Sequence, residues 1–227
     1  MKAITRQILL WAFLALLSLP AVANAQFTYT TNADHTLTIT GYAGSGGVVS
    51  IPSTINGLPV SSIGCRAFFY CFSLSSVTIP DSVTSIGKRA FSSCTSLASI
   101  HIGNSVVSIG DNAFAGCQRL TSVTIPNGLT NIGEKAFGIC PSLAGVTIPA
   151  SVTNIGKYAF LNCPRLTDIY FKGNTPSLGD DVFEGDEKAT IYYRPNTTGW
   201  GKTFGGRPTA VWNPQAMINA ACGVQAK

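Results

Sequence analysis

The sequence predicts a β-rich α/β solenoid of 23-residue coils, with a parallel sheet on one face and short strands and helical turns on the other. The first observation behind this prediction is a phenylalanine that recurs every 23 residues. Its positions are Phe68, Phe91, Phe114, Phe137, Phe160 and Phe183. A fixed period of this length indicates a solenoid, in which each repeat is one coil that buries its apolar side against its neighbours.

Further columns of like residues share the period and make the second observation. Ile-Gly pairs precede the phenylalanines and begin at Ile63, Ile86, Ile109, Ile132 and Ile155, with Leu178-Gly179 closing the series. Cysteines follow the phenylalanines, at Cys71, Cys94, Cys117, Cys140 and Cys163. Leucines come three residues later, at Leu74, Leu97, Leu120, Leu143 and Leu166. Columns in register predict that equivalent side chains stack from coil to coil.

The third observation is alternation within each repeat. The segment 120–126 has the spacing L-x-x-L-x-L, which is typical of the strand core of a leucine-rich repeat. Val123 and Ile125 alternate with Ser122 and Thr124, so the apolar pair points inward and the hydroxyls point outward. Pro126 has no N–H to donate and ends the strand.

The other half of each repeat predicts a second strand and a turn. Residues 129–133 read as a short strand on the opposite side of the coil. Gly133 permits a change of direction, and residues 134–137 predict one helical turn before the chain returns. Phe, Ile and Leu side chains are expected to fill the space between the two strand faces.

The combined pattern I-G-x-x-A-F-x-x-C-x-x-L-x-x-V-x-I-P closely resembles the BspA-like (treponemal-type) leucine-rich repeats of bacterial surface and secreted proteins. The resemblance covers roughly residues 51–193. It implies a role in binding proteins or cells, with no catalytic residues and no cofactor. The sixth copy departs from the pattern, because Asp186 replaces Cys, Ala189 replaces Leu and Arg194-Pro195 replaces Ile-Pro. We interpret that copy as the transition into a cap.

The N-terminus predicts export. Lys2 and Arg6 precede an apolar run over residues 8–19, and Ala23-Asn24-Ala25 has the form of a signal-peptidase site. The run is shorter than the roughly 20 residues of a membrane span. We therefore expect a signal peptide over residues 1–25, and a secreted or cell-surface protein that begins at Gln26. No membrane span is expected after cleavage.

The expected domain organisation follows from these segments. Residues 26–59 form an N-terminal cap, made of a hairpin (27–30 with 37–40) and a Gly-rich linker at 44–47. Residues 60–193 form the solenoid of about six coils. Residues 194–213 form a C-terminal cap in which Trp200 and Trp212 close the core, and residues 214–227 form a tail.

Composition excludes some classes of partner. Charged residues make up 11% of the chain, and the formal net charge is +5. Loss of Lys2 and Arg6 with the signal peptide lowers the charge by two, to +3. Nucleic-acid binding is not expected, because it requires a basic stripe. We expect a monomer.

The cysteine column admits three interpretations. Exported proteins usually oxidise their cysteines, which favours one or two disulfides, and a metal site is a third alternative. However, stacked coils place equivalent residues about 4.8 Å apart with parallel side chains. Buried thiols that act as small apolar residues are therefore the preferred interpretation. A bond between Cys65 and Cys222 stays open.

Two other clusters are weaker candidates for chemistry. Half of the acidic residues gather at Asp180, Asp181, Glu184, Asp186 and Glu187, which we interpret as a solvated face rather than a calcium site. His101 and Ser99 share one face but lack a third orienting group and a pocket. No metal site and no enzymatic activity are predicted.

The predicted binding face is formed by the outward side chains of the longer strands. One column contains Thr78, His101, Thr124, Thr147, Tyr170 and Tyr193. The column beside it contains Ser76, Ser99, Ser122, Gly145 and Asp168. Solenoids commonly bind extended partners on such a face, and tyrosines are good anchors. We expect a non-enzymatic module that binds a protein or cell-surface ligand; the alternative is a structural envelope or spacer solenoid without a discrete ligand.

The period predicts the result of a coil deletion. Excision of residues 95–117 removes 23 residues and joins Cys94 to Gln118, so every later column keeps its register. We expect this variant to unfold cooperatively as a shorter solenoid, measured by circular dichroism during chemical denaturation. Excision of 22 residues shifts the later columns and should abolish cooperative unfolding. Equal behaviour of the two variants would contradict the solenoid.

Overall fold

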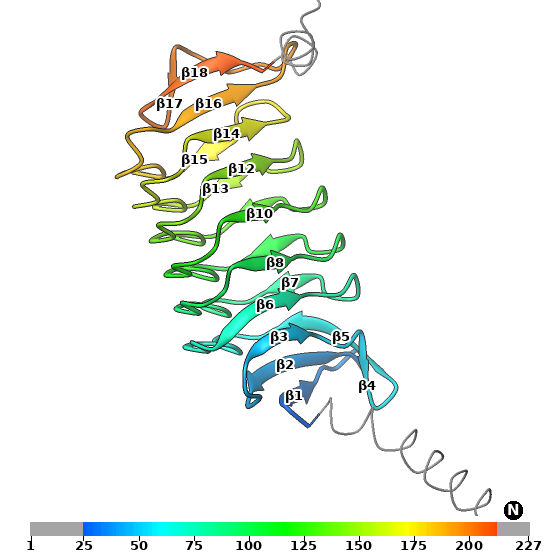
Figure 1. Ribbon diagram of the computed structural model, residues 1–227. Helices are drawn as coiled ribbons and strands as arrows, with labels where there is room; N and C mark the ends of the chain where they lie inside the picture. Colours follow the sequence, from blue (N-terminus) through cyan, green and yellow to red (C-terminus); the bar gives the residue numbers. More distant parts are fainter. Residues whose placement is uncertain (1–24, 213–227) are drawn as a thin grey trace, which may run out of the picture.

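The computed structural model describes residues 25–212. Its chain forms an elongated β-solenoid that rises coil by coil from the N-terminal to the C-terminal end (Figure 1). The predicted signal peptide, the tail and Cys222 lie outside the described residues. The solenoid of 23-residue coils is confirmed, since residues 23 apart pair along its parallel strands.

One ladder of strands lines the rear of the solenoid, with two-residue strands from β7 to β15 and longer strands β1, β2 and β5 at its N-terminal end. Their order is β1-β2-β5-β7-β9-β11-β13-β15, and β4 pairs with β5. The bounds are β1 Phe27–Thr31, β2 Leu37–Tyr42, β4 Thr54–Ile55, β5 Leu58–Ile63, β7 Ser85–Ile86, β9 Ser108–Ile109, β11 Asn131–Ile132, β13 Asn154–Ile155 and β15 Ser177–Leu178. β1 and β2 are antiparallel, and from β2 onward the main ladder is parallel.

Longer strands line the front, in two sheets rather than the single one expected. The first has the order β3-β6-β8 and the second β10-β12-β14-β16-β18-β17. The bounds are β3 Gly47–Ser50, β6 Leu74–Thr78, β8 Ser99–His101, β10 Ser122–Thr124, β12 Gly145–Ile148, β14 Asp168–Phe171, β16 Thr190–Tyr193, β17 Thr203–Phe204 and β18 Arg207–Val211. Since β3 pairs with β6, the segment expected to form the N-terminal cap contributes a strand to the front face.

The core between the two faces is organised by a stack of phenylalanine rings. Consecutive ring centroids from Phe68 to Phe183 lie 4.7–5.7 Å apart, with interplanar angles of 5–16°. All six rings are buried. Tyr42 extends the stack below Phe68 at 5.1 Å. At the other end, the backbone of Gly205 lies so close to Phe183 that a Cβ there would fall 2.8 Å from the ring. Each end of the stack is therefore covered.

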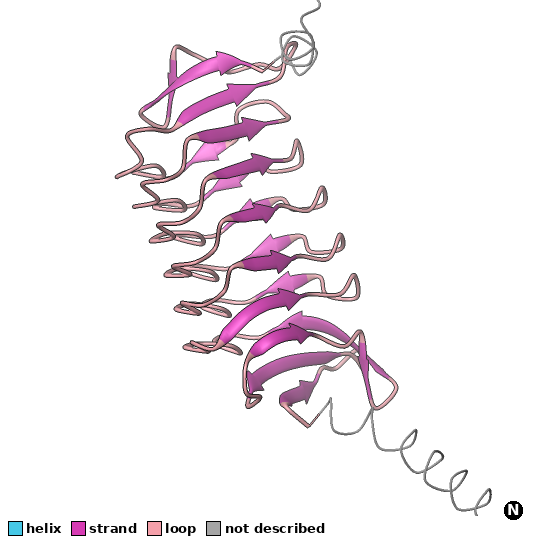
Figure 2. Ribbon diagram, in the orientation of Figure 1, coloured by secondary structure: helices cyan, strands magenta, loops and turns pink. Residues whose placement is uncertain are grey.

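The prediction of helical turns is wrong. The described residues contain strands and loops but no helix, as Figure 2 shows. In residues 110–117, alternate N–H groups bond within the coil, such as Ala113 N to Gly110 O at 3.2 Å. The intervening groups bond to the next coil, such as Phe114 N to Ala136 O at 2.8 Å. A helix would direct these N–H groups along its own axis, so the neighbouring coil competes successfully for them.

These turns impose left-handed backbone at two positions in every coil. The first column with positive φ contains Arg66, Arg89, Asn112, Lys135, Tyr158 and Asp181. The second contains Tyr70, Ser93, Gly116, Ile139, Asn162 and Gly185. Glycine and asparagine adopt this conformation at little cost, whereas bulky and β-branched residues are strained in it. Tyr70 and Ile139 are therefore the strained members of their column.

Removal of one ring should show the strength of the phenylalanine stack. Phe114 is fully buried between Phe91 and Phe137, so Phe114→Ala loses transfer free energy and leaves a cavity. We expect the free energy of unfolding in urea to fall by about 3–5 kcal/mol. The control, Lys88→Ala, removes an exposed side chain and should change it by less than about 0.5 kcal/mol. Comparable losses would contradict the assignment of the inward column.

Relief of backbone strain should stabilise the solenoid. Ile139 has φ of 58° and a side chain that is 43% exposed, so Ile139→Gly removes strain and little buried surface. We expect the free energy of unfolding to rise by about 0.5–1 kcal/mol. Val107 is similarly exposed but has ordinary backbone geometry, and Val107→Gly should lower it by about 0.5–1 kcal/mol. Destabilisation by both changes would show that Ile139 is not strained.

Candidate functional site

The outward strand face consists of the solvent-facing side chains of β6, β8, β10, β12, β14 and β16. Most of the predicted site residues form two rows on it. One row pairs Thr78 with His101, and Thr124 with Thr147 and then Tyr170. The other pairs Ser76 with Ser99, and Ser122 with Gly145 and then Asp168. The alternation in the sequence therefore places these residues on one surface.

Tyr193 is the exception and corrects the predicted site. It pairs with the buried Phe171, and its ring stacks on Trp200 at 5.1 Å. Tyr192 takes the outward position beside Tyr170 instead. The cause is one missing residue in the last repeat, where Ala189 and Ile191 are two apart while Leu166 and Ile169 are three apart.

The same shift corrects the repeat alignment. Arg194 follows Tyr193 as Lys172 follows Phe171, so Tyr193-Arg194, and not Arg194-Pro195, stands in the Ile-Pro position. The shortened spacing was visible in the sequence and is the signal that identifies Tyr192.

Three aromatic side chains form a platform at the C-terminal end of the outward strand face. We define the aromatic platform as Tyr170, Tyr192 and Trp212. The ring of Tyr170 lies 5.1 Å from that of Tyr192 and 5.0 Å from that of Trp212. The guanidinium of Arg194 lies 5.4 Å from the Trp212 ring, within the range of a cation–π contact. Trp212 was expected to close the core, but only Trp200 does so, against Phe171 and Phe204.

A groove opens beside the platform, where the front sheet divides. No strand ladder joins β8 to β10 in the described residues. The Thr121 N–H approaches Ala98 O at 3.4 Å, whereas the Ala144 N–H bonds to Thr121 O at 3.0 Å in the next coil. The groove has a volume of about 430 Å³. Its lining includes His101, Asn104, Thr124, Asn127, Thr147, Lys172 and Trp212.

The polar groups of this surface are partly engaged with one another. The hydroxyl of Thr167 donates to Asp168 at 2.6 Å, so the carboxylate is already engaged. Burial raises the pKa of the Tyr170 phenol, with smaller effects from the charge of Asp168 and from Tyr192. The phenol therefore remains a neutral hydrogen-bond donor near pH 7. Ser99 Oγ donates to Ser76 Oγ at 2.9 Å, which directs it away from any pairing with His101.

The cysteine column holds free thiols. Cys94, Cys117, Cys140 and Cys163 are buried, and no disulfide is present among the described residues. Each of these thiols donates to the carbonyl of a phenylalanine in the preceding coil, as Cys117 Sγ does to Phe91 O at 3.3 Å. Burial raises the pKa of Cys94 to about 12. These thiols pack and donate hydrogen bonds, which disfavours reactivity.

The acidic cluster divides into two parts. Asp180, Asp181, Glu184 and Glu187 are exposed, as a solvated face requires. Asp186 is instead fully buried at the position of the cysteine column, so its assignment to that face is wrong. Its Oδ1 accepts a bond of 2.6 Å from the Cys163 N–H, and its Oδ2 has no partner within residues 25–212. That part of the chain contains no group of three or more His, Cys, Asp or Glu side chains suited to a metal ion.

Comparison with known proteins identifies the repeats. Six copies of the BspA type leucine rich repeat region match residues 61–190. A leucine-rich repeat protein from T. pallidum is similar over 90% of this chain and 95% of its own, with 30% identity and a TM-score of 0.71. A leucine-rich cell surface protein from Faecalibacterium prausnitzii is 33% identical over 75% of this chain and 53% of its own, with a TM-score of 0.57.

The pneumococcal vaccine antigen PcpA shares the fold at 22% identity, over 79% of this chain and 48% of its own, with a TM-score of 0.60. The chain matches none of the curated proteins with which it was compared.

The buried carboxyl predicts a pH dependence of stability. Burial raises the pKa of Asp186 to about 7, against the opposing effects of the Cys163 N–H and of Arg207. Because this pKa exceeds that of the unfolded chain, the contribution is complete below about pH 4 and is lost as pH rises through about 7. Each pKa unit corresponds to about 1.4 kcal/mol. Asp186→Asn keeps the acceptor and cannot ionise.

We therefore expect Asp186→Asn to gain stability relative to the unaltered chain between pH 5 and pH 8, measured by urea denaturation at both values. Asp181→Asn alters an exposed carboxyl and serves as the control, for which no such gain is expected. An equal difference between Asp186→Asn and the unaltered chain at both pH values would contradict the raised pKa.

Proposed function

The chain belongs to the family of BspA-type leucine-rich repeat proteins, and from that premise we propose that it is an exported, non-enzymatic module that binds a protein or cell-surface ligand on its outward strand face. The aromatic platform beside the groove is the observation that carries this proposal. Tyr, Trp and Arg are the residues that most often dominate the energy of protein interfaces. Here Tyr170, Tyr192, Trp212 and Arg194 lie together at one end of a hydroxyl-rich surface.

The repeats supply an internal comparison for the platform. Thr124 and Thr147 occupy the positions equivalent to Tyr170 in the two preceding coils. Threonine is therefore sufficient for the strand at this position, and the coil does not require an aromatic ring there. The fold does not require the tyrosines, which add aromatic surface at this position. Side chains that contact a ligand are expected to have this property.

The groove supports an extended ligand that crosses several coils. Its lining residues His101, Thr124 and Thr147 belong to consecutive coils and succeed one another along the solenoid axis. Thr124 and Thr147 are paired at the strand spacing of roughly 4.8 Å, and His101 lies across the division of the front sheet. Lys172 and Trp212 also line the groove, and Trp212 belongs to the platform. A ligand lying along this line meets hydroxyl and amide groups in the groove and aromatic rings at its end.

Export is supported by the sequence of residues 1–25, which has the pattern of a signal peptide. The similar protein from Faecalibacterium prausnitzii is described as a cell surface protein. Across residues 25–212 there is no helix with the length and apolarity of a bilayer span. We propose that the mature chain acts outside the cytoplasm, in solution or at the cell surface.

Replacement of the platform tyrosines tests this function. The double change Tyr170→Thr and Tyr192→Thr installs the residue type that earlier coils carry on the outward strand face. Immobilised residues 26–227 are used to capture proteins from envelope and host-cell extracts, and the Kd of each captured, purified protein is measured for both chains. We expect at least tenfold weaker binding by the variant, about 1.4 kcal/mol, because one buried aromatic anchor contributes that much. Its melting temperature should change little.

The matched control is Asp181→Asn with Glu184→Gln, which alters exposed carboxylates on the acidic face. This variant should bind as the unaltered chain does. Loss of capture in the control variant alone would move the site to the acidic face. A chain that captures nothing and self-associates into rods would favour a structural spacer instead.

A further inference from the structure

A second exposed aromatic cluster lies on the turn edge, the side of the solenoid formed by the turns that precede the front strands (left edge of Figure 1). We define the turn-edge aromatic patch as Phe69, Tyr70 and Phe72. The rings of Phe69 and Tyr70 stack with centroids 3.9 Å apart, and those of Tyr70 and Phe72 with centroids 5.4 Å apart. Tyr70 is 54% exposed and Phe72 is 55% exposed. Two of the three adjoining rings are thus exposed to solvent outside the core, and Phe69 is half-buried beneath Tyr70.

The coil does not need these rings. The equivalent residues in the next coil are Ser92, Ser93 and Thr95, and in the one after that they are Ala115, Gly116 and Gln118. The same turns form in all three coils, and their backbone hydrogen bonds match except for one added bond of 2.8 Å in the first coil, from the Phe72 N–H to Tyr70 O. Tyr70 also has φ of 61°, which is unfavourable for a bulky side chain. A strained and exposed aromatic residue that the neighbouring coils replace by serine or glycine points to a role in binding.

Arginine and lysine side chains lie beside the patch. The guanidinium of Arg66 lies 5.6 Å from the Phe69 ring centroid. A hollow of about 300 Å³ adjoins the rings and is lined in part by Tyr70, Arg89, Lys135 and Ile139. None of the described residues that line it is Asp or Glu. The hollow therefore combines the aromatic and aliphatic side chains of Tyr70 and Ile139 with serine and asparagine side chains and two positive charges.

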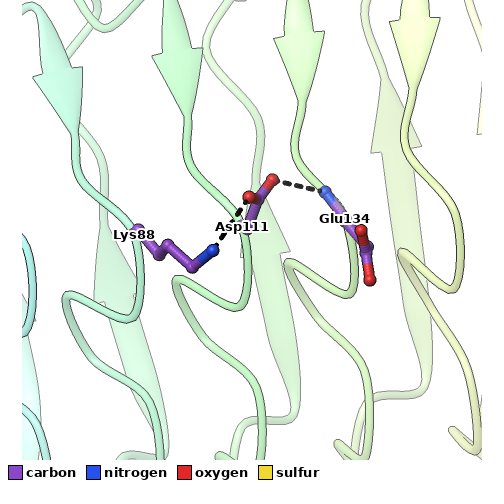
Figure 3. A network of polar contacts seen from close by, with 3 residues as sticks. All are labelled: Lys88, Asp111 and Glu134. Carbon is purple, nitrogen blue, oxygen red and sulfur yellow. Dashed lines mark hydrogen bonds and ion pairs between the residues drawn. The ribbon is translucent and has the colours of Figure 1, made fainter.

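Two carboxylates lie nearby, and one of them is already engaged. Asp111 Oδ2 is 3.6 Å from Lys88 Nζ, and its Oδ1 accepts a bond of 3.1 Å from the Glu134 N–H (Figure 3). Counting Arg66, Lys88, Arg89 and Lys135 against Asp111 and Glu134 leaves two positive charges in excess. The charge of this edge is thus complementary to an acidic partner.

We propose that the turn-edge aromatic patch and its hollow form a second binding surface, which takes an acidic protein segment that also carries aromatic or aliphatic side chains. The apolar side chains of the segment pack on Tyr70, Phe72 and Ile139, and its carboxylates face Arg89 and Lys135. A peptide segment fits the concave hollow, whereas a lipid surface would require a protruding one. This surface lies on a different side of the solenoid from the outward strand face and does not depend on the function proposed for that face.

The test exchanges the patch for the sequence of the next coil. The variant Phe69→Ser, Tyr70→Ser and Phe72→Thr carries the residues found at 92, 93 and 95, and it should melt at or above the temperature of the unaltered chain. A random peptide library displayed on phage is selected on residues 26–227, with prior removal of phage that bind the variant. We expect enriched peptides to combine Asp or Glu with Phe, Leu or Ile. Their affinity should fall at least tenfold in the variant and in Arg89→Ser with Lys135→Ser.

Several results would overturn the proposal. They are the absence of enriched peptides, the enrichment of basic peptides, and equal affinity for the unaltered chain and both variants. Patch-dependent binding to phosphatidylglycerol vesicles, without binding to the peptides, would identify a membrane surface instead. If the triple variant does not fold, Tyr70→Ser and Phe72→Thr are tested singly against the same criteria. The variant Tyr170→Thr with Tyr192→Thr should retain the peptides, which separates this proposal from the function of the outward strand face.

Discussion

Stacking of each coil on the next in constant register is the constraint on which the structure depends. A single coil cannot bury its own phenylalanine, because the faces of that ring are covered by the rings above and below. The same register directs alternate N–H groups of the turns to the neighbouring coil and brings each buried thiol to a phenylalanine carbonyl. Core, turns and cysteine column are thus consequences of one repeated translation.

The two ends of the solenoid show how the stacking of coils is terminated. At the N-terminal end, β1 runs antiparallel to β2 and Tyr42 covers the first phenylalanine. At the C-terminal end, the last repeat loses one residue between Ala189 and Ile191, and the β17–β18 pair closes over Phe183. The buried Asp186 belongs to this transition, since it stands where earlier coils carry a thiol and accepts a hydrogen bond from the Cys163 N–H instead. Covered ends keep a solenoid from adding further copies of itself.

Repetition also makes candidate binding residues easy to recognise. Every coil packs in the same way, so a residue that differs from the others in its column without a packing reason is a candidate for contact with a partner. Tyr170 follows Thr124 and Thr147 in its column, and Tyr70 precedes Ser93 and Gly116 in a column with left-handed backbone. Both are exposed enough to meet a partner, and neither is required by its coil. The division of the front sheet between β8 and β10 is a departure of the backbone in the same sense, and it opens into the groove that Trp212 also lines.

The sequence by itself determined the period, the inward and outward columns and the family, because each of these depends on residue types that repeat along one chain. The pairing of Thr124 with Thr147 and the burial of Phe114 follow directly from that pattern. The absence of helical turns, the division of the front sheet, and the union of Tyr170, Tyr192 and Trp212 were decided only by the tertiary structure. The physical reason is that a hydrogen bond or a ring contact between coils depends on where the neighbouring coil lies, and periodicity within one coil does not report that position.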